Sequence, residues 1–271
     1  MSSQISFSEI ESLTNVYRKH PILKIKRMRR KTMKLIIEKD EHAMSESAMF
    51  IILGAMMQDK RVNISLTSGR SPKTMYDMMI PYVKEQDKFK DIHYYLFDEN
   101  PYLDQEHGPN WNEMQDLFFK EAHIPNERIH IMNENDWEDF DNQIRNVGDL
   151  DVMIIGLGHD GHFCGNCPRC TPFDSYTYKL DFKEKQKVNP TYGDRPKQPF
   201  TLTMGPKSLM RVKHLVMIVN GKEKAEIFKR FLDEPINPDV PATILKLHPN
   251  FTVICDGDAA SLIKPDKYTR I

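Results

Sequence analysis

The chain has 271 residues and a formal net charge of −1, and 39% of its residues are apolar. This composition predicts a globular core and argues against nucleic acid as the main partner. No apolar run approaches the roughly 20 residues that span a bilayer, four cysteines do not suggest a disulfide scaffold, and no signal-peptide pattern is visible, so we expect a cytoplasmic protein without a membrane partner.

The N-terminal residues differ from the rest of the chain. Residues 1–32 end in a basic run, KIKRMRRK at 24–31, which can be a nuclear signal, a contact with an anionic surface, or a solvated and partly disordered leader. A clean strand pattern begins at Met33. We therefore expect a basic leader over residues 1–32 and a single α/β domain over residues 33–271.

Strand and helix patterns alternate from Met33 onward. The expected strands cover residues 33–38, 62–66, 92–97, 152–155, 214–219 and 251–255. The expected helices cover residues 44–55, 72–83, 111–122 with Asn110 as a cap, 137–146 and 222–232. Such alternation predicts a doubly wound, mostly parallel sheet with helices on both faces.

Residues 181–199 break this alternation, because they are polar and include three prolines. They are expected to form either a mobile excursion over the functional edge of the sheet or a plain surface loop.

The segment that follows the strand at 152–155 carries an acid and a histidine. Its sequence from Gly156 is GLGHDGH, which ends with Asp160 and His162. Ligands bind beyond the carboxyl ends of strands in open α/β sheets, and a histidine there can move protons near neutral pH. The alternative is a capped turn with a structural histidine.

The connection from the strand at 62–66 to the next helix could bind a phosphate. Gly69 permits a tight turn, Ser71 can cap the helix and Pro72 suits its first position. Free amide groups at a helix start, together with the guanidinium of Arg70, suit phosphate oxygens. A merely capped helix explains the same residues.

Two further strand ends carry charged residues. Asp98 and Glu99 follow the strand at 92–97 and could include a general base, or they could be ordinary acids of a surface turn. Lys224 lies near a helix start after the strand at 214–219, where it could meet a phosphate or be an exposed lysine.

Three cysteines at a spacing of three residues, Cys164, Cys167 and Cys170, raise the question of a metal site, with a histidine as a fourth ligand. Three reduced thiols in a loop are the alternative, and we expect no metal.

The ordered set of motifs resembles the glucosamine-6-phosphate deaminase/6-phosphogluconolactonase superfamily. The resemblance runs from Met33 to Asp256, and its motifs are Thr67–Pro72, Phe97–Glu99, Gly156–His162, Asn166, Lys224 and Leu247–Pro249. The segments His162–Asn166 and Thr203–Ser208 are most similar to a poorly characterised deaminase-like branch of bacterial proteins.

This resemblance implies a Rossmann-like fold that works without a nucleotide or metal cofactor, on a small phosphosugar. It implies that Asp98 carries a proton between C2 and C1 of the opened sugar, and that His162 assists ring opening with support from Asp160. Members often self-associate, so a homo-oligomer is expected. The residues implied to hold the 6-phosphate are Ser68, Gly69, Arg70, Ser71 and Lys224.

Two positions depart from the subgroups of this superfamily. The deaminases have a glutamate where this chain has Cys167, and the lactonases have an arginine where it has Asn100. The leading hypothesis is aldose–ketose isomerisation of a hexose 6-phosphate, with or without loss of an amine. The alternatives are a 6-phosphogluconolactonase, in which His162 activates water, and a sugar-phosphate-binding regulator without catalysis.

Overall fold

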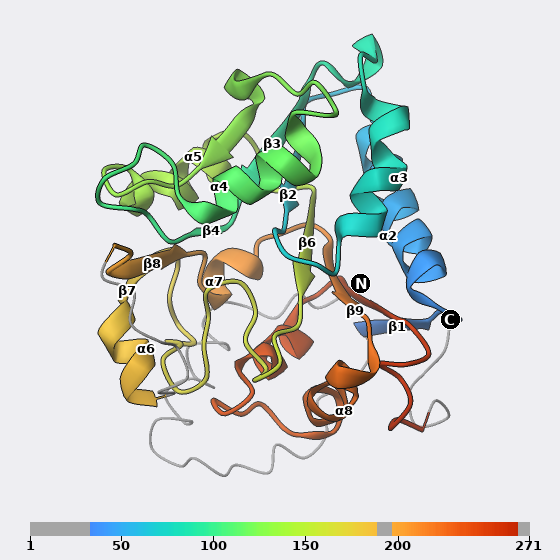
Figure 1. Cartoon of the computed structure of the whole chain (residues 1–271), viewed down its shortest axis with the longest axis vertical. Coiled ribbons are helices and arrows are strands. Elements are labelled where there is room, and N and C mark those ends of the chain that lie inside the picture. Colours follow the sequence, from blue (N-terminus) through green and yellow to red (C-terminus); the bar gives the residue numbers. More distant parts are fainter. Residues whose placement is uncertain (1–32, 189–196, 265–271) are drawn as a thin grey trace.

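The computed structural model describes residues 33–188 and 197–264, so the expected leader over residues 1–32 lies outside the described residues. Seven strands form the central sheet in the order β1-β10-β9-β6-β2-β3-β5 (Figure 1). Every neighbouring pair in this sheet is parallel. The expected doubly wound, mostly parallel α/β sheet is confirmed.

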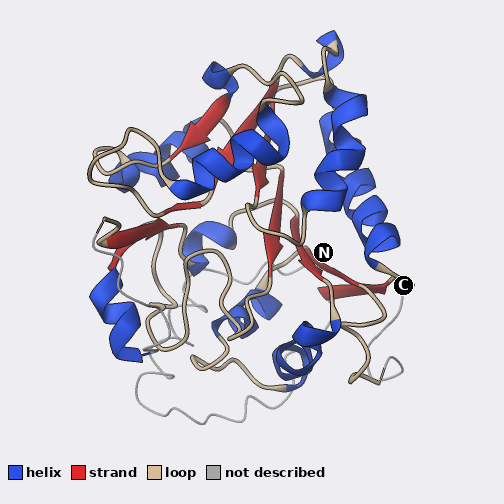
Figure 2. Ribbon diagram, in the orientation of Figure 1, coloured by secondary structure: helices blue, strands red, loops and turns tan. Residues whose placement is uncertain are grey.

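The strands of the central sheet and its helices alternate along the chain, and Figure 2 distinguishes the helices from the strands. The strands are β1 (Met33–Ile37), β2 (Val62–Leu66), β3 (Ile92–Leu96), β5 (Ile129–Ile131), β6 (Val152–Gly156), β9 (Leu215–Val219) and β10 (Phe251–Cys255). The α-helices around them are α2 (Glu41–Met56), α3 (Lys73–Val83), α4 (Pro109–Met114), α5 (Phe140–Asn146), α7 (Pro206–Leu209) and α8 (Ala225–Asp233).

A small antiparallel sheet lies beside the central sheet and was not predicted. It consists of β4 (Asp98–Glu99), β8 (Phe200–Thr203) and β7 (Tyr178–Asp181), with β8 in the middle. Helix α6 (Phe182–Val188) follows β7. The expectation of a loop over residues 181–199 is therefore wrong for its first part, because these residues end a strand and form a helix whose Phe182 and Lys185 are buried.

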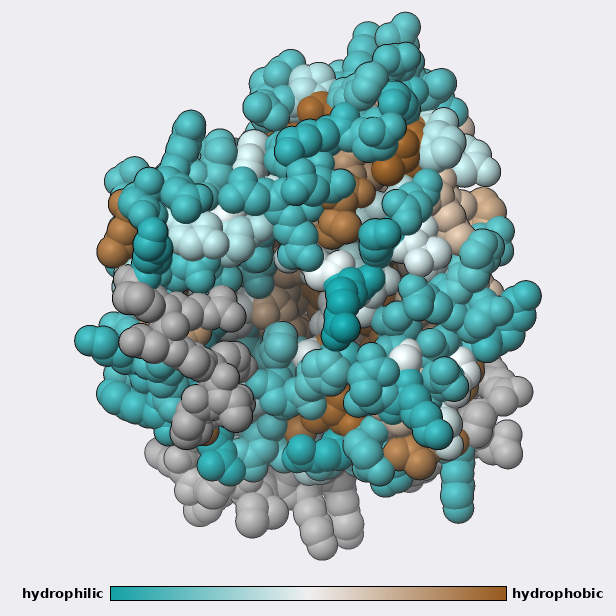
Figure 3. Space-filling view, in the orientation of Figure 1, coloured by the Kyte–Doolittle hydropathy of each residue, from teal (hydrophilic) through white to brown (hydrophobic). Residues whose placement is uncertain are grey.

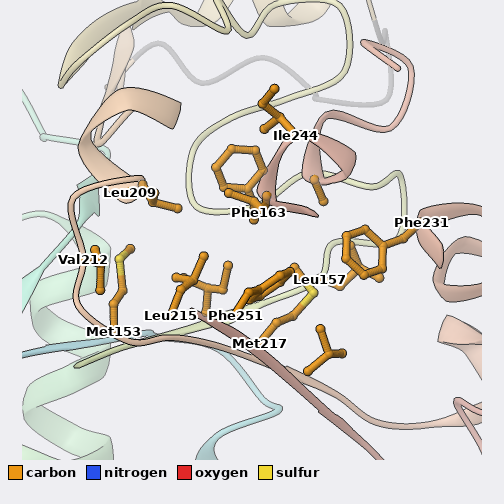
Figure 4. Close-up of a cluster of buried hydrophobic side chains, with 14 of the residues drawn as sticks. Met153, Leu157, Phe163, Leu209, Val212, Leu215, Met217, Phe231, Ile244 and Phe251 are labelled. Atoms are coloured by element: carbon orange, nitrogen blue, oxygen red, sulfur yellow. The ribbon is translucent and has the colours of Figure 1, made fainter. Parts of the chain in front are cut away.

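The core has two parts, one on each face of the central sheet. Val152 and Ile154 of β6 belong to one buried cluster, and Met153 and Ile155 belong to the other, part of which Figure 4 shows. A strand covered on both faces is apolar at consecutive positions, which explains why β6 was visible in the sequence. On the face shown in Figure 3, most of the coloured surface is hydrophilic.

Two expected helix caps are not formed. Helix α3 begins at Lys73 after Pro72 and has no side-chain cap, so Ser71 does not cap it. Helix α4 begins at Pro109, which leaves Asn110 inside the helix and not at its cap. The expected helix over residues 111–122 is α4 followed by a π-helical turn over Gln115–Phe119.

The order of the strands creates one switch point, between β2 and β6. From β2 the chain proceeds outward through β3 to β5, whereas from β6 it proceeds in the opposite direction through β9 to β10. The loops after two such strands leave in opposite directions and open a crevice at their carboxyl ends, where ligands bind in this class of fold.

A buried carboxylate fixes the start of β6. Asp151 accepts hydrogen bonds from Lys60 Nζ at 2.8 Å, Lys213 Nζ at 2.9 Å and the backbone amide of Asn63 at 2.9 Å. Burial alone would raise the pKa of Asp151, but these donors outweigh it and hold that pKa below its ordinary value. Asp151 thereby ties β6 to the residues that start β2 and β9.

We expect the Asp151→Asn variant to lose about 2–4 kcal/mol of unfolding free energy at pH 7, because two lysines lose a charged partner and the Asn63 amide keeps a weaker acceptor. Since the pKa is depressed in the folded chain, this stabilisation is present above about pH 4 and is lost as the pH falls through the folded-state pKa. Urea denaturation at pH 7 and at pH 3 measures both values.

The matched control is Asp116→Asn, which removes an exposed i,i+4 pair with Lys120 and should cost less than about 0.5 kcal/mol. Equal losses in the two variants would contradict the anchoring role of Asp151.

Candidate active site

The turn after β6 holds Asp160 and His162 as a pair. Asp160 Oδ1 accepts a hydrogen bond from the backbone amide of His162 at 3.0 Å and lies 2.6 Å from its Nδ1. Beneath the ring, a Cβ at Gly158 would lie 2.1 Å from the same Nδ1, so only glycine fits there. The carboxylate therefore fixes the ring, and an Nδ1–H bond to it leaves Nε2 as the nitrogen available to a ligand.

The two acids after β3 have different surroundings. Glu99 is buried and accepts hydrogen bonds from the backbone amides of Asn100, Asn110 and Trp111 at 2.8–3.1 Å. Its carboxylate thus serves as the N-terminal cap of α4 that the sequence had assigned to Asn110. This arrangement makes Glu99 structural and leaves Asp98 as the acid that faces the cavity.

Asp98 has an unusual pKa for a carboxyl group. Burial, followed by the negative charge of Glu99, raises the pKa of Asp98 from 3.8 to about 7, against the opposing effects of Lys185 and of the hydrogen bond from Asn110. That bond joins Asn110 Nδ2 to Asp98 Oδ1 at 2.8 Å. Asp98 can therefore both accept and donate a proton near neutral pH.

Asp98 and His162 line one cavity of about 200 Å³, which we call the Asp98–His162 pocket. Ser68 from the loop after β2 reaches the same cavity. The other lining residues are Asn100, Asn110, Cys164, Gly165, Cys167, Phe182, Lys185 and Thr201. The pocket thus joins three carboxyl-end loops of the central sheet with the small sheet and α6.

Lys185 is the lining residue that sequence reasoning missed most clearly. Its side chain is buried, and its Nζ donates a hydrogen bond to Thr201 Oγ1 at 2.7 Å. Thr201 Oγ1 donates in turn to Asn100 Oδ1 at 2.7 Å. The only signal in the sequence was the spacing of Phe182 and Lys185, which lie three residues apart on one helix face.

The residues expected to hold a phosphate lie in the loops after β2 and β9, and the charges of these loops influence each other. Gly69 has a φ of +101°, which confirms the tight turn after β2. Burial lowers the pKa of Lys224, and the charge of Arg70 lowers it further, whereas Glu223 and Asp160 oppose this. Lys224 Nζ donates to the Leu157 carbonyl at 2.6 Å, which joins the loops after β9 and β6.

A side chain of α3 holds the start of the loop that follows β2. Tyr76 Oη donates a hydrogen bond to the Thr67 carbonyl at 2.7 Å. Arg70 is exposed, and Ser68, Gly69 and Ser71 are partly exposed. These residues are therefore accessible to a ligand, and Ser68 is the one of them that lines the pocket.

Within the described ranges, no group of three or more His, Cys, Asp or Glu side chains is arranged to hold a metal ion. All four cysteines are free thiols, and Cys167 is buried. The same part of the chain has no helix long and apolar enough to cross a membrane.

The fold and the pocket define a class of protein: a doubly wound α/β protein with a protonatable acid and an oriented histidine at its switch point, beside a cationic loop. Residues 38–254 match the family of glucosamine-6-phosphate isomerases/6-phosphogluconolactonase. The chain belongs to this family.

Relatives with curated functions cover nearly the whole chain. A glucosamine-6-phosphate deaminase of Shouchella clausii is 31% identical over 243 residues, which are 85% of this chain and 97% of that protein. A glucosamine-6-phosphate deaminase of Lactobacillus johnsonii is 34% identical over 246 residues, 86% of this chain and 98% of that protein.

Solved structures agree with this assignment. A monomeric glucosamine-6-phosphate deaminase matches with a TM-score of 0.72 and 27% identity, over 85% of this chain and all of that chain. The 6-phosphogluconolactonase of Trypanosoma cruzi has a TM-score of 0.67 at 18% identity, over 88% of this chain and 99% of that chain, and shares the fold.

We expect the Asp98→Asn variant to be more stable than the unchanged chain at pH 8, by about 1–3 kcal/mol. A raised folded-state pKa means that ionising Asp98 destabilises the fold. Stability therefore falls as the pH rises from about 4 through about 7. The variant avoids this loss because an amide does not ionise. Chemical denaturation at pH 5 and pH 8 should show the gap widening with pH. A variant that is less stable at pH 8 would contradict the raised pKa of this carboxyl group.

Proposed function

We propose that the chain is a glucosamine-6-phosphate deaminase, which converts the aminosugar phosphate to a ketose phosphate and releases ammonia. The observation that carries this proposal is the pairing of Asp98 and His162 on one cavity of about 200 Å³. The names and identities of the curated relatives support the same substrate. The reaction needs a base and a group that opens the sugar ring, and the substrate needs an anchor for its 6-phosphate.

Asp98 acts as the proton carrier of the isomerisation. In the ring-opened sugar, its carboxylate takes the proton from C2, which carries the amine, and its protonated form returns that proton to C1. The resulting C2 iminium is hydrolysed by water, so that ammonia leaves and a C2 ketone remains. A pKa of about 7 suits both halves of this transfer, because each form of Asp98 is populated near neutral pH.

His162 opens the sugar ring. With Nδ1 held by Asp160, the neutral ring offers Nε2 as a proton acceptor for the C1 hydroxyl. Asp160 also stabilises the imidazolium that forms, because its carboxylate lies 2.6 Å from the ring. Asp160 is therefore a positioning residue for His162.

The 6-phosphate binds at the rim formed by Ser68, Gly69, Arg70, Ser71 and Lys224. Arg70 and Lys224 supply two positive charges, and the serine hydroxyls and loop amides supply neutral donors. Burial of the Lys224 ammonium lowers its pKa, and a bound phosphate dianion compensates for that burial.

We expect purified protein to release ammonia from glucosamine 6-phosphate, with kcat/KM rising with pH through about 7 as Asp98 ionises. The Asp98→Asn variant should lose about 10²–10⁴-fold in kcat, since an amide cannot carry the proton. A coupled ammonia assay between pH 5.5 and 8.5 measures both.

The control for this experiment is Asp104→Asn, which changes an exposed acid that pairs with Lys197 and should leave the rate unchanged. A flat pH profile in this range, or an Asp98→Asn variant with full turnover, would contradict the proton-carrier role. Hydrolysis of a 6-phosphogluconolactone with full activity in Asp98→Asn would favour the lactonase alternative.

A second prediction concerns the phosphate anchor. We expect Lys224→Met to raise KM for glucosamine 6-phosphate about 10–100-fold, because one charge-assisted contact to the phosphate is lost. Lys222→Met is the matched control, since Lys222 lies in the same short helical turn and is exposed. Steady-state kinetics should show KM unchanged in that control, and similar KM values in the two variants would exclude Lys224 from the phosphate site.

A further inference from the structure

The loop after His162 carries three cysteines that the proposed reaction does not use. Cys164 and Cys167 line the Asp98–His162 pocket, and Cys170 is partly exposed outside it. Because no metal-binding group is arranged among the described residues, the spacing that raised the metal question needs another explanation.

Cys167 and Cys170 lie at the two ends of one tight turn. The Cys170 amide donates a hydrogen bond to the Cys167 carbonyl at 3.3 Å, which is the bond of a four-residue turn. The Cα atoms at the ends of such a turn lie less than about 7 Å apart, a separation within reach of a disulfide. The Cys170 thiol also lies close enough to the Cys167 thiol to raise its pKa.

Neighbouring contacts hold this turn in shape. The Arg169 amide donates to the Pro238 carbonyl at 2.9 Å, and the Arg169 side chain pairs with Asp239. Thr171 Oγ1 donates to the Cys167 carbonyl at 2.8 Å. The two thiols are therefore kept together by the backbone, so that little chain entropy is lost when they are joined.

The two thiols differ in their surroundings. Burial raises the pKa of the Cys167 thiol, and the neighbouring Cys170 raises it further. Cys170 has access to solvent. A soluble oxidant therefore reaches Cys170 first, and Cys167 is the thiol that completes the bond.

We propose that Cys167 and Cys170 form a redox-modification site, which low-molecular-weight disulfides convert to an intramolecular disulfide at the wall of the pocket. Cys170 attacks one sulfur of the soluble disulfide and releases one small thiol. Cys167 then attacks Cys170 Sγ in the mixed disulfide and releases the second. Two protein thiols are oxidised, one soluble disulfide is reduced to two thiols, and their protons pass to these products.

Oxidation would affect the pocket at two places, at Cys167 and at helix α6. Cys167 itself lines the cavity, and Cys170 Sγ donates a hydrogen bond to the Glu184 carbonyl at 3.7 Å. A disulfide sulfur carries no hydrogen to donate, so helix α6 loses this contact next to Lys185. We therefore expect the disulfide to lower the turnover of the pocket reversibly.

The test uses the full-length protein treated with oxidised glutathione, then alkylated and digested with trypsin without reduction. Trypsin cuts between Arg169 and Cys170, so the disulfide would join peptides 146–169 and 170–179, and reduction would separate them. The same samples should release ammonia at least about fivefold more slowly than reduced protein, with recovery after dithiothreitol.

Two variants assign the bond. Cys164→Ser should keep the joined peptides, because its own peptide still holds Cys167, whereas Cys170→Ser should lose them and keep its rate in oxidised glutathione. Cys170 does not line the pocket, so its basal rate should equal that of the unchanged chain. This comparison separates the Cys167–Cys170 bond from oxidation elsewhere.

Glutathione that persists on Cys170, or the absence of joined peptides, would overturn the proposed bond. Joined peptides with an unchanged rate would overturn its effect on the pocket. The peptide map needs no substrate, so it decides the site even if the proposed deaminase reaction fails, and only the rate measurement rests on that reaction.

Discussion

The parallel pairing of β2 with β6 at the switch point is the constraint on which the candidate site depends. It brings the carboxyl ends of β9, β6, β2 and β3 to one edge of the sheet in that order. Each of these strands is followed by one part of the proposed chemistry: a lysine, an acid–histidine pair, a cationic turn and a carboxyl group. The sheet therefore assembles residues that lie more than 100 positions apart in the sequence.

A carboxyl group with a pKa of about 7 lowers the stability of the folded chain at a pH where that group is ionised. Asp98 is destabilising when ionised, and the negative charge of Glu99 beside it adds to this effect. The backbone amides that Glu99 caps offset part of the cost of burying its carboxylate, whose pKa is still raised. The adjacent acids thus divide the work, because one fixes the start of α4 and the other remains available for proton transfer.

Sequence patterns predicted the parts of the structure that depend on local composition. Strands such as β6 and β10 are mostly apolar because both faces are covered. Asp160 and His162 follow a glycine-rich turn whose geometry is local. The small sheet and the burial of Lys185 could not be predicted, because Thr201 and Asn100, which orient Lys185 in the pocket, are distant in the sequence. The capping role of Glu99 was missed for the same reason, since its partners are eleven or twelve residues away.

Cys167 belongs both to the departure of this chain from the deaminase pattern and to the proposed redox-modification site. The resemblance to the deaminases implies a glutamate at this position, whereas a buried thiol with a raised pKa supplies no negative charge to the histidine. In this chain the carboxylate that orients His162 is Asp160, which bonds both its amide and its ring. Because Asp160 holds His162 from within the same turn, the proposed bond between Cys167 and Cys170 leaves in place the carboxylate that orients the histidine.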